Sequence, residues 1–217
     1  MNIPFVGMRK EKFVHKTGTR IPHWVQEGAS YFITFRCADS IPTGLARQWS
    51  HERECWLNAH PPPWTEEEER AYTEKFTARM EEWLDQGMGA CLLRDQANRD
   101  LLEQALIRFD GIRLDVDGYV IMPNHVHLII HPHENEDPIR LIGGMKGASA
   151  RAIQARMGKS GETFWMPDEY NRIIRDAKEL VAYRHYLEIN PLRAGLHERE
   201  FTLKLNRVLS FNPWVLL

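Results

Sequence analysis

The chain has 217 residues, which is enough for one domain with a sizeable core and short for two. Its 28 Lys and Arg against 30 Asp and Glu give a formal net charge of −2, so any nucleic-acid binding must depend on local charge. The three cysteines are far apart and lack a Cys-x-x-Cys pair, which argues against a disulfide framework and a cysteine zinc site. Without an apolar run of signal-peptide or membrane-span length, we expect a cytoplasmic protein with no membrane partner.

Charge is unevenly distributed along the chain. Met1 to Arg20 has a net charge of +4, and Arg140 to Leu180 has a net charge of +3. His51 to Asp85 holds four basic and ten acidic residues, a net charge of −6. The acidity is therefore local, and a basic face can lie elsewhere on the molecule.

The first half predicts one strand followed by helices. After a basic lead-in over residues 1–27, Ser30 to Cys37 is short and rich in aromatic and β-branched residues, as strands are. Leu45 to Leu57 predicts a helix that the prolines after His60 stop. Thr65 and Glu68 form a capping box that opens an acidic helix ending near Leu84. We expect residues of about 51–90 to form an acidic helical insertion.

The second half alternates helices and strands. Asp95 to Phe109 has apolar residues at helical spacing, and Asp117-Gly118 is a tight-turn signal between two antiparallel strands. The later expectations are a helix over Ile139 to Met157 with Lys146 open to solvent, a strand over Tyr170 to Ile174, and a helix over Ala177 to Ile189 capped by Asp176. Residues 197–217 are expected to form a C-terminal tail. One domain spans residues 1–217.

Two histidines stand out in the second strand of this predicted pair. Successive side chains of a strand alternate faces, so His125 and His127 point the same way and can bind one ion. Val126 and Leu128 then face the opposite side. Two imidazoles leave coordination positions open for a substrate phosphate.

The residues around this pair resemble a known family. Met122 to Leu128 is similar to the Met-Pro-Asn-His-x-His-hydrophobic hallmark of the REP-associated tyrosine transposases, a branch of the IS200/IS605-like single-tyrosine HUH transposases. Tyr186 to Leu196 is similar to the Tyr-x-x-x-Asn-Pro-x-x-Ala-Gly-Leu ending of the same branch. The resemblance runs from about Gly28 to Leu196. It implies an α+β fold with an antiparallel, ferredoxin-like (split βαβ) palm sheet, helices packed mainly on one face, and the helical insertion as an addition.

The resemblance also implies a chemistry. Tyr186 would be the nucleophile, and Asn190 would complete a site for Mg²⁺ or Mn²⁺ with His125 and His127. The reaction would be cleavage and rejoining of single-stranded DNA through a 5′-phosphotyrosine, near a REP-type hairpin, by a monomer or a homodimer. Tyr186 and Asn190 lie one helical turn apart, and Pro191 predicts that the helix ends at Asn190.

Several alternatives stay open. Helical geometry alone would also allow Tyr183 to be the nucleophile. Possible DNA contacts are Lys146, Arg172, Arg175 and Trp165, although solvated charge or core packing would explain each equally well. A different hypothesis is a hairpin-binding or sequence-specific DNA-binding protein without catalysis. Another is an unrelated hydrolase whose metal is bound by His125, His127, His131 and His133.

Overall fold

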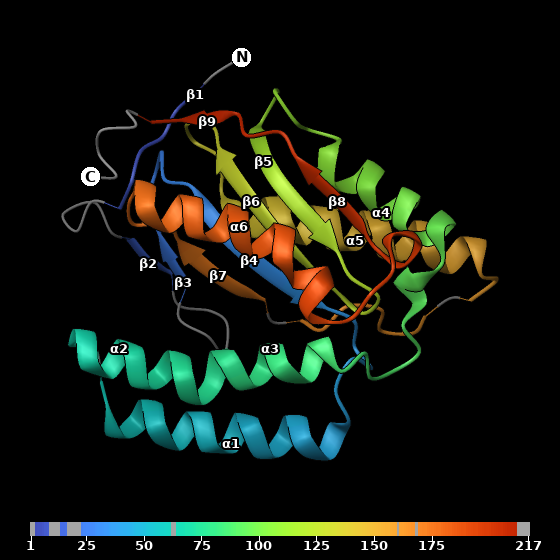
Figure 1. Ribbon diagram of the computed structural model, residues 1–217, viewed down its shortest axis with the longest axis horizontal. Helices are drawn as coiled ribbons and strands as arrows, with labels where there is room; N and C mark the ends of the chain where they lie inside the picture. Colours follow the sequence, from blue (N-terminus) through green and yellow to red (C-terminus); the bar gives the residue numbers. More distant parts are fainter. Residues whose placement is uncertain are drawn as a thin grey trace.

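A five-stranded antiparallel sheet forms the centre of the molecule (Figure 1). The computed structural model describes residues 3–8, 14–16, 23–61, 64–159, 161–167 and 169–211. The sheet has the order β7-β4-β6-β5-β8, which confirms the predicted antiparallel α+β fold. Its strands are β4 (Tyr31–Arg36), β5 (Leu114–Ile121), β6 (His125–Pro132), β7 (Tyr170–Ile173) and β8 (Thr202–Leu205). Two small additions are β1 (Ile3–Pro4) paired with β9 (Leu209–Ser210), and β2 (Val14–Lys16) paired with β3 (His23–Val25).

The histidine strand β6 is the middle strand of the sheet. It pairs with β4 on one side, where Thr34 lies opposite His127, and with β5 on the other. Because both neighbours contribute hydrogen bonds along its length, the backbone of β6 is held on both edges. The two histidines therefore sit on a rigid support.

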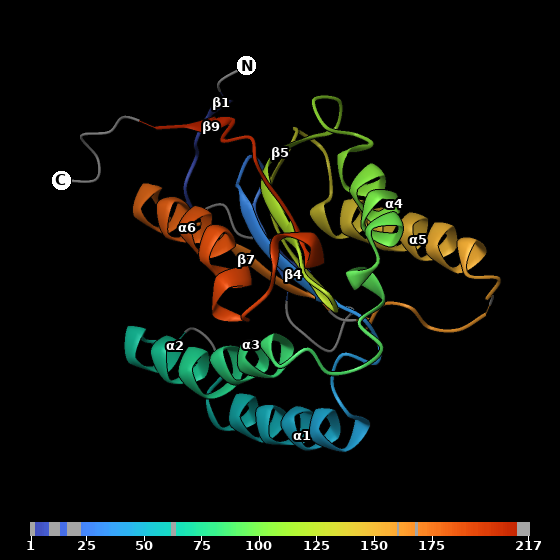
Figure 2. The same ribbon diagram turned by 45° about the vertical axis from the view of Figure 1, so that its right-hand side comes forward.

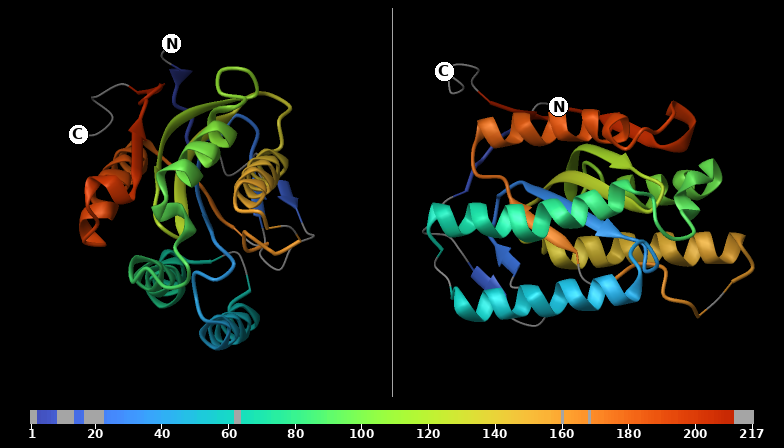
Figure 3. Two further views of the ribbon diagram at one scale, coloured as in Figure 1. Left: turned by 90° about the vertical axis from the view of Figure 1, so that its right-hand side faces the viewer. Right: turned by 60° about the horizontal axis from the view of Figure 1, so that its bottom comes forward.

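Helices cover both faces of the sheet (Figures 2 and 3). Helices α4 (Gln96–Ile107) and α5 (Pro138–Arg156) pack on one face, over a core that includes Val126 and Leu128 of β6. Helix α6 (Ala177–Arg193) packs on the other face, where Ile129 meets Leu187. Apolar side chains alternate between both faces of β6, so each face needs a helical cover. We call the sheet together with α4, α5 and α6 the palm. Two of its helices, α4 and α5, cover one face, and α6 covers the other.

A helical hairpin lies between β4 and α4 in the sequence. Its first arm is α1 (Thr43–Ala59), and its second arm runs without a break through α2 (Glu66–Tyr72), a π-turn (Thr73–Thr77) and α3 (Ala78–Asp85). The predicted capping box is present, because Thr65 accepts from the Glu68 backbone N–H and Glu68 accepts from the Thr65 backbone N–H. The hairpin packs on itself through aromatic side chains such as Trp56, Tyr72 and Phe76.

The predicted turn at Asp117-Gly118 is wrong. These residues lie inside β5, at a β-bulge between Val116 and Gly118, and the chain reverses instead at Pro123 and Asn124. The Asp117 carboxylate is fully buried and accepts two hydrogen bonds from Arg184 of α6. Asp117 and Gly118 therefore form a bulge, and the Asp117 carboxylate forms a buried ion pair there. The partner of this ion pair is distant in sequence, so the local pattern does not predict it.

The C-terminal tail is more ordered than its weak pattern indicates. Residues Thr202–Leu205 form the edge strand β8, paired with β5. Arg99 of α4 is fully buried and donates to Thr202 Oγ1 and to the Arg199 carbonyl, so it fastens this segment to the palm. Part of the basic lead-in and residues 212–217 lie outside the described residues.

Candidate active site

His125 and His127 converge on one point of the α6 face. Their Nε2 atoms are 3.0 Å apart, and both side chains are buried. Asn124 donates its amide N–H to the Met88 carbonyl, so its Oδ1 is left to accept from His125 Nδ1 at 2.8 Å. His127 Nδ1 lies 2.7 Å from Thr34 Oγ1. Each Nδ1 is thus engaged, and the two Nε2 atoms face each other.

Burial keeps both imidazoles neutral. It lowers the pKa of His125 to about 3 and lowers the pKa of His127 well below its ordinary value, with the neighbouring His125 adding to the second effect. Neutral imidazole is the form that binds metal ions. The pair is therefore in the ligating state across the neutral pH range.

Helix α6 supplies the other two predicted residues. The Tyr186 hydroxyl lies 3.5 Å from His127 Nε2, and Asn190 Nδ2 lies 3.4 Å from the same nitrogen. The prediction that the helix ends at Asn190 is wrong, because α6 continues through Pro191 to Arg193. A proline this close to the end of a helix removes only one backbone hydrogen bond, and Pro191 is itself buried. Asn190 consequently points into the core and reaches His127 from within the helix.

The donor set fits a divalent cation. Asn190 Oδ1 is buried and has no hydrogen-bond partner, which is costly for a polar atom in a protein interior. Beside it are the two imidazole Nε2 atoms, 3.0 Å apart. One amide oxygen and two imidazoles can hold Mn²⁺ or Mg²⁺, and the mixed nitrogen and oxygen set suits Mn²⁺ well.

The structure distinguishes the two tyrosines of α6. Tyr186 meets His127 edge to face, with ring centroids 5.0 Å apart, and directs its hydroxyl at the histidine pair. Tyr183 instead stacks flat on Phe32, with ring centroids 4.1 Å apart. Of these two tyrosines, it is therefore Tyr186 whose hydroxyl reaches the histidine pair.

The histidines of the alternative hydrolase site do not join this cluster. His131 lies 3.3 Å from Ser30 Oγ, and His133 pairs with Asp115 at 2.7 Å. Among the described residues, no group of three or more His, Cys, Asp and Glu side chains is placed to bind a metal. Among the described residues, Tyr186 contacts His127 of the predicted pair, and neither His131 nor His133.

Glu81 of α3 is a site residue that sequence reasoning missed. Its carboxylate interacts with the Tyr186 side chain. Burial raises the pKa of Glu81 to about 7. Burial also raises the pKa of Tyr186, and the negative charges of Glu81 and Asp85 add to that effect. No local pattern marks Glu81 among the ten acidic residues of this segment, since only folding brings α3 to α6.

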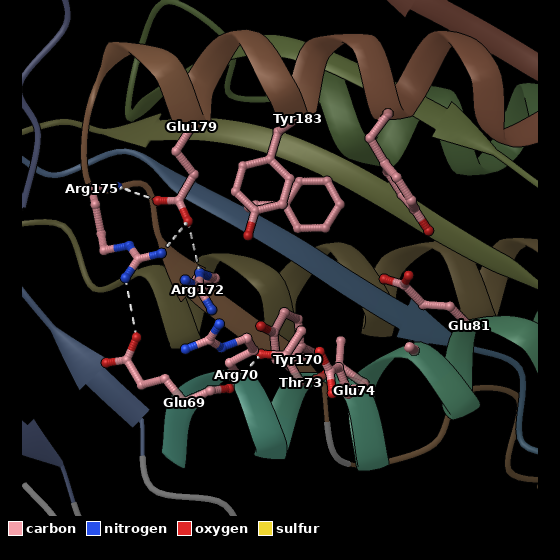
Figure 4. A pocket seen from close by; sticks show the side chains of 14 residues that line it. Glu69, Arg70, Thr73, Glu74, Glu81, Tyr170, Arg172, Arg175, Glu179 and Tyr183 are labelled. Carbon is pink, nitrogen blue, oxygen red and sulfur yellow. Dashed lines mark hydrogen bonds and ion pairs between the residues drawn. The ribbon is translucent and has the colours of Figure 1, made fainter. Parts of the chain in front are cut away.

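A cleft of about 780 Å³ lies between the helical hairpin and the palm (Figure 4). Tyr186 is among the residues that line it. Arg172 and Arg175, two of the possible DNA contacts, line it. Each is held by Glu179, and Arg175 also pairs with Glu69 across the cleft. Glu81 lies on the hairpin side of the cleft and Tyr183 reaches in from α6 (Figure 4).

Lys146 and Trp165 lie away from this cleft. Contrary to the expected exposure, Lys146 is buried and donates to Glu169 and to the Pro167 carbonyl. Trp165 is buried, donates to Ser149 Oγ and meets Phe35 edge to face. Core packing, the alternative given above for Trp165, is what the structure shows. Both side chains support the loop after α5.

Fold and site together define an α+β domain with a histidine pair and a tyrosine at one centre. Residues 93–190 match the family model described as "Transposase IS200 like". This match confirms the resemblance to IS200-like transposases that the two motifs indicated. A comparison with proteins of curated function finds no match to the sequence.

Two solved structures are similar to the chain. One is a REP-associated tyrosine transposase bound to a REP hairpin, with 16% identity, 79% of this chain and 72% of that chain covered, and a TM-score of 0.45. The other is a protein from Deinococcus radiodurans, provisionally described as a transposase, with 16% identity, 81% and 97% coverage, and a TM-score of 0.37. Among the described residues, no helix is long and apolar enough to cross a membrane.

Proposed function

We propose that the protein cleaves and rejoins single-stranded DNA through a covalent bond between Tyr186 and a 5′-phosphate. The observation that carries this proposal is the convergence of the Tyr186 hydroxyl, the Nε2 atoms of His125 and His127, and the unpaired Oδ1 of Asn190. The IS200-like domain supports DNA as the substrate. The motif resemblance to the REP-associated branch supports a hairpin as the DNA structure that is recognised.

Each residue has a defined task in this proposal. His125, His127 and Asn190 would hold a divalent cation, which would neutralise charge on the scissile phosphate when bound. The Tyr186 oxygen attacks phosphorus, the bond between phosphorus and Tyr186 forms, and the bond to the 3′-oxygen breaks. Because the phosphodiester energy is retained in the phosphotyrosine, a later 3′-hydroxyl can reverse the step and rejoin strands.

All four groups come from one chain. Tyr186 contacts His127 of its own palm, so the site is complete without a helix from a second copy. This arrangement supports catalysis by a monomer.

The test is incubation of the protein with labelled single-stranded hairpin DNA and Mn²⁺ or Mg²⁺, followed by a denaturing gel. We expect a labelled protein band that depends on the metal and disappears in Tyr186→Phe and His127→Ala. One matched control is Tyr183→Phe, on the same helix as Tyr186. The other is His133→Ala, directly after the end of β6. Both should keep the band.

Other outcomes separate the alternatives. Hairpin binding without any covalent band would favour a DNA-binding module. Cleavage that survives Tyr186→Phe would contradict the tyrosine mechanism and point to water or Tyr183 as the nucleophile. Loss of cleavage in His133→Ala would favour the histidine-based hydrolase.

A further inference from the structure

The helical hairpin contributes a polar group to a site otherwise built by the palm. Tyr186 stands on α6, within the matched family residues, whereas Glu81 stands on α3, outside them. The two side chains nevertheless line the same cleft and interact with each other, at the hydroxyl that would attack the phosphate. The Tyr186 phenol thus lies between His127 on one side and Glu81 on the other.

We infer that Glu81 is a catalytic residue that accepts the Tyr186 proton during DNA cleavage and returns it during rejoining. This inference rests on the proposed function. In cleavage, the Tyr186 oxygen bonds to phosphorus, its proton passes to the Glu81 carboxylate, and the departing 3′-oxygen takes a proton from water. In rejoining, the 3′-oxygen bonds to phosphorus and loses its proton to water, the bond to Tyr186 breaks, and Glu81 protonates the released phenolate.

A phenol needs such a partner. Its ordinary pKa is near 10. The neutral phenol is therefore the resting form, and it must lose its proton as the bond to phosphorus forms. His125 and His127 are poorly placed for this task if their nitrogens serve as ligands, which leaves the carboxylate as the acceptor in direct contact.

The surroundings of Glu81 suit a group that both takes and gives a proton. Its neighbours are Tyr186 and Arg193 of α6 and Asp85 of its own helix. Tyr183 is also close enough to interact electrostatically with Glu81. Burial is the largest influence and raises the pKa of Glu81 to about 7, with Asp85 adding to the rise and Arg193 opposing it. An acid–base group works best when its pKa is near the working pH.

The arrangement also gives the hairpin a role. Without α3, the phenol would lose its interaction with Glu81. With α3 in place, Glu81 is held by the continuous helix that begins at the capping box of Thr65. The acidic segment would then be part of the reaction centre rather than a solvated appendage.

The experiment measures the rate of covalent adduct formation with synthetic hairpin DNA and Mn²⁺ between pH 5.5 and 9. We expect Glu81→Gln to form the adduct about 10²- to 10⁴-fold more slowly, the usual range for loss of an acid–base group. The glutamine keeps the size of the side chain and can still hydrogen-bond to Tyr186, so a purely structural role would be preserved. The matched control is Glu82→Gln, the exposed neighbour on α3, which should react at the wild-type rate.

The pH profile tests the proton transfer directly. The carboxylate must be ionised to accept the proton, so the wild-type rate should rise with pH through about 7 and then level off. Glu81→Gln should lose this inflection. The inference is overturned if Glu81→Gln reacts as fast as wild type, or if it is slow but keeps the inflection, which would indicate positioning only.

Folding failure and failure of the proposed function are told apart by the same assay. Thermal unfolding and hairpin binding verify that Glu81→Gln is folded. The pH profile of the wild-type protein is a test that does not depend on any variant, because a wild-type rate without an inflection near pH 7 would contradict the inference. If wild type forms no adduct at all, the proposed function itself fails. An adduct from wild type and an equal adduct from Glu81→Gln would leave that function standing and remove only the role of Glu81.

Discussion

At the scale of single residues, Asn190 shows a conflict between stability and function. Its Oδ1 is buried without a partner, so it destabilises the metal-free protein. Asn190→Leu has a similar volume and removes this atom. We expect the metal-free free energy of unfolding to rise by about 1 kcal/mol, while the increase in melting temperature on adding Mn²⁺ is lost.

Thermal unfolding with and without Mn²⁺ measures both the stability and the metal response. Asn206→Leu is unsuitable as a control because the Asn206 amide donates to the Val116 carbonyl. A better control is Asn135→Gly, at an exposed position with positive φ, which should keep the full metal response. An unchanged Mn²⁺ response in Asn190→Leu would show that the amide is not a ligand.

At the scale of elements, the buried pair of Asp117 and Arg184 joins the bulge of β5 to α6. Arg184 lies two residues before Tyr186, so the pair also fixes the position of Tyr186, the proposed nucleophile, along the sheet. Asp117→Asn leaves the guanidinium without its countercharge in a buried place. We expect a loss of about 3–5 kcal/mol in the free energy of unfolding, measured by urea denaturation.

The exposed pair of Arg207 and Glu188 is the matched comparison. It has a similar length of 2.6 Å, but both side chains are solvent-accessible. Arg207→Ala should therefore cost less than about 1 kcal/mol. Equal losses in the two variants would mean that the buried pair has no special part in fixing α6.

At the scale of the whole molecule, the helical hairpin and the palm have separate cores. Neither hydrophobic cluster of the palm includes a residue from 43–86. The two ends of the hairpin lie together, because the Asp39 carboxylate accepts from the Ala90 backbone N–H at 2.7 Å. Gly89, with φ +86°, allows this approach, since a Cβ there would meet the Asp39 carbonyl oxygen at 2.5 Å.

Replacing residues 43–86 with a short Gly-Ser linker should therefore leave the palm folded. We expect circular dichroism to show one cooperative thermal transition, and adduct formation to fall at least as far as in Glu81→Gln, because Glu81 is removed. Loss of the transition would mean that the palm depends on the hairpin for its stability. A folded palm with the wild-type adduct rate would argue against any catalytic part for α3.

Local patterns predicted most elements because each is encoded over a few neighbouring residues. The alternation from Val126 to Leu128, the capping box of Thr65 and the apolar spacing of α4 all match the structure. The Asp117-Gly118 turn and the end of α6 at Pro191 were wrong for a common reason. In both places buried contacts from elsewhere in the chain outweigh the local preference for a turn or a helix end.

Sequence alone was sufficient for the IS200-like domain, the antiparallel α+β fold and the shared face of His125 and His127, because motifs and strand alternation are local. Only the tertiary structure decided that Lys146 and Trp165 are buried and that Tyr186, rather than Tyr183, reaches His127. It alone brought Glu81 to Tyr186, across more than a hundred residues of chain. Such contacts depend on how helices pack, and no short-range pattern records which residues will meet.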